Sequence, residues 1–95
     1  MTKRNFIIDD GKESIPVEGY EHKNVAVRYL MKRRRSLLMT KDPKKVEELF
    51  AQLPLKIKII GKQVTKTYDI KWERIGTEEF SGARFVFTIE ESKTA

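Results

Sequence analysis

The sequence contains no cysteine. This absence excludes disulfide bonds, thiolate metal sites and cysteine nucleophiles, and it is consistent with a reducing compartment. The single histidine, His22, cannot form a metal site with other imidazoles of the same chain, and it falls in an expected polar loop at residues 21–24. We therefore expect no metal, no cofactor and no catalytic residue, and we predict that the protein is not an enzyme.

Long apolar runs are also absent. The first residues, MTKRNF, have no apolar run of signal-peptide length, and no window approaches the roughly 18 apolar residues of a membrane span. The five glycines stand apart and form no phosphate-binding loop. We expect one soluble, intracellular, cytoplasmic domain over residues 1–95 without a membrane partner, and flexible ends near residues 1–3 and 92–95.

One helix is predicted by several independent signals, over residues 43–53. Asp42 can accept hydrogen bonds from the first turn, Pro43 suits the first helical position, and Pro54 prevents continuation. Between them an apolar stripe recurs at the i, i+3, i+4, i+7 spacing, formed by Val46, Leu49, Phe50 and Leu53. We expect this stripe to pack on a sheet and to contribute core residues.

The strands are predicted from alternation of apolar and polar residues. Short strands are expected at residues 6–8, 14–20, 55–61, 68–73 and 85–89. Pro16 should place the second of these at an edge or a bulge, because proline cannot donate to a ladder. Alternation indicates that one face of the sheet is exposed to solvent, which is typical of an antiparallel sheet. The fold class predicted is therefore α+β, with an antiparallel sheet of about five or six strands and the helix at residues 43–53 packed on one face.

Residues 25–40 can be interpreted in two ways. As a strand, Val25, Val27, Tyr29 and Met31 share one face. As a helix, the segment has good propensity and a broad apolar stripe, but Arg34 falls in the middle of that stripe. We predict two strand segments joined by a bend near residues 32–34, with the helix as the alternative.

The positive charge is concentrated in one segment. Residues 21–45 contain nine Lys or Arg against two acids, a balance of +7, whereas the whole chain carries +6 and the other 70 residues therefore −1. Such clustering is typical of a protein that binds a polyanion, although a basic patch can also bind an acidic protein. The run from Lys32 to Arg35 is its densest part.

The function predicted is non-enzymatic binding of DNA or RNA, mainly through backbone phosphates and with weak sequence preference. The predicted contact residues are Arg28, Tyr29, Lys32, Arg33, Arg34, Arg35, Lys41 and Lys44. Tyr29 is the candidate for stacking on a base, and packing in the core or at a sheet edge is the alternative role for its ring. A protein-interaction module, an inhibitor or assembly factor that applies the same basic face to an acidic partner, is the alternative function.

Overall fold

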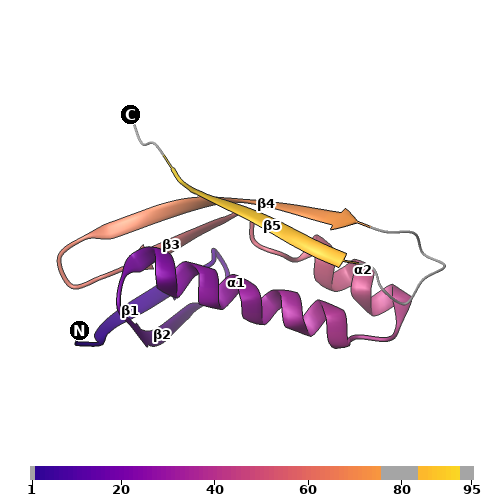
Figure 1. The fold of residues 1–95 in the computed structure, drawn as a ribbon, viewed down its shortest axis with the longest axis horizontal. Helices are drawn as coiled ribbons and strands as arrows, with labels where there is room; N and C mark the ends of the chain where they lie inside the picture. The colour runs from indigo at the N-terminus through magenta and orange to yellow at the C-terminus, as the bar shows by residue number, and fades with distance from the viewer. Residues whose placement is uncertain (1, 76–83, 93–95) are drawn as a thin grey trace.

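The structure is a computed structural model that describes residues 2–75 and 84–92. Its elements, in chain order, are β1 (Arg4–Asp9), β2 (Ser14–Gly19), α1 (His22–Met39), α2 (Pro43–Ala51), β3 (Lys56–Ile60), β4 (Thr65–Ile75) and β5 (Arg84–Glu91). Of the flexible ends predicted near residues 1–3 and 92–95, residues 1 and 93–95 lie outside the described residues. The α+β class predicted from the sequence is confirmed (Figure 1).

All five strands form one antiparallel sheet in the order β2-β1-β3-β4-β5. Each strand predicted by alternation is present, and β2, which contains Pro16, lies at an edge as expected. The inward-facing residues run across the sheet in register, for example Ile15 beside Ile8 and Ile8 beside Ile59. β4 and β5 extend beyond the end of β3 and form a long hairpin arm (Figure 1).

The two strands predicted within residues 25–40 are wrong, because this segment belongs to the long helix α1. The predicted loop at residues 21–24 is corrected as well, since the helix begins at His22. The segment has good helix propensity, because it is rich in Lys, Arg, Leu and Met and has no Gly or Pro, and burial of one helix face on the sheet decides between helix and strand. The close approach of Val25 to Gly19 lets the helix start directly after β2, because a Cβ at residue 19 would overlap the Val25 side chain.

Helix α1 covers one face of the sheet and makes the main core. Ala26 and Leu30 are completely buried and Val25 almost so. They pack with inward-facing residues of β1, β3 and β4, namely Phe6, Ile8, Ile57, Ile59, Tyr68 and Ile70, with Ile15 and Val17 of β2 partly buried beside them. Figure 1 shows α1 below β4 and β5, with β1 and β2 beside its N-terminal part.

Helix α2 confirms the predicted helix at residues 43–53 in position but not in its expected share of the core. Its cap is the predicted one, because the Asp42 side chain accepts a hydrogen bond from the Lys44 N–H at 3.0 Å. None of its residues is fully buried. Phe50 instead lies against Phe85 of β5, with ring centroids 5.6 Å apart, and so helps to cover the hairpin arm.

These placements predict a contrast between neighbouring residues of α1. Leu30→Ala removes a fully buried side chain and should lower the free energy of unfolding by about 2–5 kcal/mol. Met31→Ala is the matched control, because Met31 is 47% exposed and its truncation should cost less than about 1 kcal/mol. Denaturant titration measures both changes. Equal losses would mean that α1 packs on the sheet with a different face.

Candidate nucleic-acid interface

Helix α1 carries six Lys or Arg and no acid. Successive residues of a helix are turned by about 100°, so neighbours in the sequence point in different directions. The buried residues Val25, Ala26, Tyr29, Leu30 and Leu37 define the face that lies on the sheet. The position of each cation relative to this face decides whether it reaches solvent.

Three cations lie together on the solvent-facing side of α1. Arg28, Lys32 and Arg35 are spaced i, i+4, i+7, and all three are exposed. We call them the outer cation line. Arg28 also donates from Nη1 to the Glu18 carbonyl of β2 at 3.0 Å. The outer cation line is the part of the predicted patch that the helix displays as one surface.

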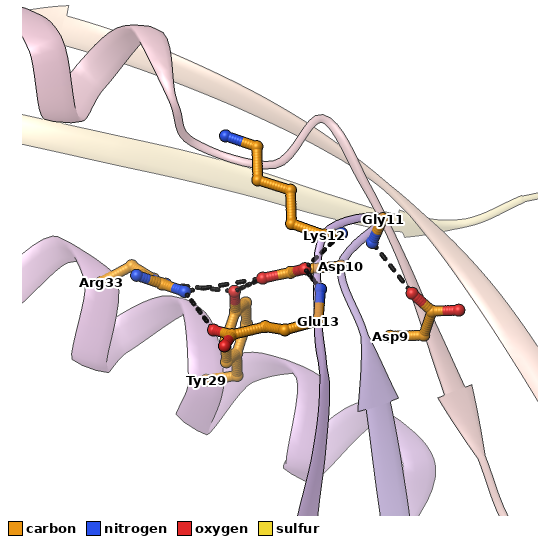
Figure 2. Close-up of polar contacts among 7 residues, drawn as sticks. All are labelled: Asp9, Asp10, Gly11, Lys12, Glu13, Tyr29 and Arg33. Carbon is orange, nitrogen blue, oxygen red and sulfur yellow. Dashed lines mark hydrogen bonds and ion pairs between the residues drawn. The ribbon is translucent and has the colours of Figure 1, made fainter.

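Arg33 belongs instead to a polar cluster between α1 and the β1–β2 turn (Figure 2). The Tyr29 hydroxyl donates to Asp10 Oδ2 at 2.6 Å, and Arg33 Nε donates to the Tyr29 hydroxyl oxygen at 3.1 Å. Arg33 Nη2 lies 3.5 Å from Asp10 Oδ2 and 3.4 Å from Glu13 Oε1. The guanidinium is therefore matched by two carboxylates of the protein itself.

Backbone hydrogen bonds in the β1–β2 turn hold the Asp10 side chain in position for this contact. Its Oδ1 atom accepts hydrogen bonds from the N–H groups of Lys12 and Glu13, at 2.9 and 3.0 Å. Gly11 has a φ of 92°, the left-handed geometry that glycine adopts without strain, and its N–H donates to Asp9 Oδ1. The turn thus aims Asp10, whose side chain is only 6% exposed, at Tyr29 and Arg33.

The cluster shifts the titration of its members. Burial and the hydrogen bond donated to Asp10 raise the pKa of Tyr29 to about 12. Burial alone would raise the pKa of Asp10, but the hydrogen bonds from Tyr29 and from the backbone, with the nearby Arg33 charge, outweigh it and lower that pKa. Burial likewise opposes the charge of Arg33, yet the hydrogen bond to Tyr29 and the two carboxylates leave the pKa of Arg33 raised.

Arg34 lies on the side of α1 that faces β5 and is bound to that strand. Its Nε donates to the Phe85 carbonyl of β5 at 2.7 Å. The four consecutive cations therefore divide into two groups: Lys32 and Arg35 face solvent, whereas Arg33 and Arg34 bind other parts of the protein. The run does not form the single patch that its sequence indicates.

The remaining predicted contact residues are placed differently. Lys41 and Lys44 are exposed, one in the link between the helices and one in the first turn of α2. Tyr29 is only 8% exposed, so its ring packs in the core and is not presented for stacking. Core packing, the alternative role considered for Tyr29, is the one that the structure shows.

The other face of the sheet does not offer a comparable basic surface. Its lysines alternate with acids: Lys56 Nζ lies 3.6 Å from Asp69 Oδ1, and Lys71 Nζ lies 3.6 Å from Glu73 Oε1. Lys56 and Asp69 face each other across β3 and β4, and such cross-strand pairs stabilise a solvated sheet face modestly, whereas Lys71 and Glu73 lie two residues apart on β4. Arg28, Lys32 and Arg35, by contrast, share one helix face and have no carboxylate partner among the described ion pairs.

His22 has a structural position. Its Nε2 atom lies 2.7 Å from the Val64 carbonyl oxygen, and Gly61 leaves the space that the ring occupies. The ring also packs edge-on against Phe6, with centroids 4.9 Å apart. Within residues 2–75 and 84–92, no three His, Cys, Asp or Glu side chains are grouped so that they could hold a metal ion.

Sequence reasoning missed Asp10 and Glu13 as partners of the cluster, because no local signal links these acids to residues about 20 positions later in the chain. The helical alternative for residues 25–40 would have shown the outer cation line.

No family model, curated protein or solved structure matches the chain. Across the described part of the chain, no helix is long and apolar enough to cross a membrane.

The polar cluster predicts an alkaline transition. Because the folded pKa of Tyr29 is raised to about 12 from about 10 in the unfolded chain, its contribution to stability is complete below pH 10 and is lost between pH 10 and 12. Tyr29→Phe should remove this loss, together with a tyrosinate absorbance change near pH 12. At neutral pH it should cost about 1–3 kcal/mol, because it removes a hydrogen bond to a charged group.

Unfolding titrations from pH 7 to 12 test this, with Tyr20→Phe as the control, since Tyr20 is 46% exposed. The expected result is a smaller loss of stability above pH 10 for Tyr29→Phe than for the control. Identical pH profiles for the two variants would contradict the contact between Tyr29 and Asp10.

Proposed function

We propose that the protein is a non-enzymatic, cytoplasmic nucleic-acid-binding protein that contacts backbone phosphates through the outer cation line of α1, with weak sequence preference. The observation that supports the proposal most directly is that Arg28, Lys32 and Arg35 share one exposed face of a helix without any acid. Lys41 and Lys44 are exposed further along the chain and add to the positive field.

The length of the outer cation line suits a phosphate backbone. Arg28 and Arg35 are seven residues apart, which corresponds to about 10 Å along a helix axis. One strand of B-form DNA carries a phosphate every 3.4 Å or so along its axis, so about three phosphates fall within that length. Three cations in a row can therefore each approach a phosphate, and none of these contacts depends on the base.

Arg33 and Arg34 have a different role in this proposal. Both are partly buried and bound to the protein, so their release toward a nucleic acid would leave Asp10 or the Phe85 carbonyl without its partner. Arg28 also donates to a carbonyl, that of Glu18, but its side chain is exposed and so remains accessible to a phosphate. We assign Arg33 and Arg34 to positioning α1 on the sheet. The phosphate contacts then belong to the exposed cations alone.

The salt dependence of binding tests this assignment. Replacement of Arg28, Lys32 and Arg35 together by Ala should weaken binding to all nucleic-acid sequences alike. It should flatten the plot of log affinity against log salt by about 0.7–0.9 units for each phosphate that is no longer neutralised, or about two to three units in total. Fluorescence anisotropy with a labelled oligonucleotide at several salt concentrations measures the slope.

The matched control replaces Lys56, Lys58 and Lys71 by Ala. These three exposed lysines lie on the uncovered sheet face, and their removal changes the net charge by the same amount. The control should retain most of the slope. Equal flattening in both triple variants would indicate a diffuse charge effect, and no binding by the unaltered protein at low salt would refute the proposal.

A second candidate function is supported by exposed apolar side chains on the same helix. Met31 and Leu38 are 47% and 48% exposed, and Met39 is 74% exposed. Apolar residues beside cations are typical of a protein interface, where the apolar groups carry much of the binding energy. The second candidate function is therefore binding to an acidic protein partner, with this protein acting as an inhibitor or an assembly factor.

The exposed apolar residues discriminate between the two candidates. Met31→Ser combined with Leu38→Ser should change nucleic-acid affinity by less than about threefold, because phosphate contacts are electrostatic and those side chains carry no charge. The same anisotropy titration measures it. A decrease of more than about tenfold would contradict binding through phosphates alone. An acidic protein partner, in contrast, should lose most of its affinity for this variant, because apolar contacts carry much of the energy of a protein interface.

A further inference from the structure

The sheet has two outer strands, β2 and β5, and the structure treats them differently. An outer strand presents unpaired N–H and C=O groups to which another strand can bind. In β2, Pro16 has no N–H to offer, and Arg28 occupies the Glu18 carbonyl at 3.0 Å. At the β2 edge the donor of Pro16 is therefore missing and the acceptor of Glu18 is occupied, which makes this edge a poorer template for a further strand.

The orientation of the backbone groups in β5 follows from two hydrogen bonds. The Ser92 N–H donates to the Thr67 carbonyl at 2.8 Å, which extends the ladder between β4 and β5. Groups of alternate residues point the same way in an antiparallel pair, so the even-numbered residues of β5 face β4 and the odd-numbered ones face outward. The bond from Arg34 to the Phe85 carbonyl agrees with this assignment.

Among the described residues, most of this outer edge has no partner. Arg34 occupies the carbonyl of Phe85, and no hydrogen bond from the described parts of the chain reaches the outward N–H and C=O groups of Phe87, Ile89 and Glu91. β5 contains no proline and no lysine, the residues that commonly protect an edge. Its side chains Phe87 and Ile89 are only partly buried against the core.

We propose that two copies of this chain pair through β5 in an antiparallel arrangement, which joins their sheets. The charges of the strand, RFVFTIEE, favour its own copy: it begins with Arg84 and ends with Glu90 and Glu91. Antiparallel pairing centred on Thr88 places Arg84 of each copy opposite Ser92 and diagonally beside Glu90 of the other, a separation that long side chains can bridge. Arg84 and Glu90 also lie on the same face of the sheet, as cross-strand partners must.

The same pairing places apolar groups together. Phe87 and Ile89 lie on the face that carries α1, so the partly exposed side chains of the two copies would meet beside the joined strands. A two-fold axis perpendicular to the sheet would put both α1 helices on one side of it. The pairing is argued from the β5 edge alone and does not depend on the proposed function.

Hydrogen exchange of individual amides tests the pairing directly. In a concentrated sample, the Phe87 and Ile89 amides should be protected at least about tenfold more than in a dilute one, because they donate to the second copy only in the dimer. The Thr88 and Glu90 amides are the internal control, since they face β4 and should be protected equally in both samples. Sedimentation equilibrium should show a mass approaching twice the 11.2 kDa of one chain.

Charge reversal provides a second test that leaves the core intact. Arg84→Glu and Glu90→Arg should each weaken the dimer by about tenfold, because like charges then lie diagonally beside each other at two symmetric positions. The double variant, R84E with E90R, should regain most of the affinity. The matched controls are Arg4→Glu and Glu18→Arg, which lie on β1 and β2 and should leave the dimer unchanged.

Two results would overturn the proposal. One is a single-chain mass at every concentration up to the millimolar range. The other is a dimer whose Phe87 and Ile89 amides exchange freely and whose affinity is unaltered by either single reversal, since that dimer uses another surface.

Discussion

The burial of one face of α1 on the sheet is the interaction on which the rest of the structure depends. Ala26 and Leu30 are completely shielded from water, and the sheet residues beneath them form the main core. Once this face is committed, the helical repeat leaves no freedom in where the other side chains of α1 point. The direction of every cation on the helix is therefore set by apolar burial and not by electrostatics.

The run from Lys32 to Arg35 illustrates this dependence. Its charges adjoin in the sequence, but the helix separates them: Arg33 reaches two carboxylates near the β1–β2 turn, and Arg34 reaches the carbonyl of Phe85. Arg28, one turn earlier, reaches a carbonyl of β2. The helix thus holds the outer strand on each side of the sheet with one arginine, and its solvent-facing cations are left without a carboxylate among the described contacts.

The distribution of charge over the molecule supports the outer face of α1 as the binding surface. On the uncovered sheet face, lysines and acids lie close enough to offset each other, as Lys56 and Asp69 do. At the β1–β2 turn, Asp10 and Glu13 offset Arg33. The exposed apolar side chains of Met31 and Leu38 lie on the same helix as the outer cation line, so a partner that binds there meets both kinds of contact.

Local sequence signals were sufficient to predict the α+β class, the five strands, the edge position of β2 and the capped helix α2, because alternation, proline and a helix cap act over a few residues. The helix at residues 22–39 required tertiary packing, because its strand-like alternation and its helix propensity conflict locally and burial against the sheet resolves the conflict. Contacts between distant residues also determined the site. Tyr29 and Arg33 meet Asp10, which lies about 20 residues earlier, and this partnership cannot be read from local sequence.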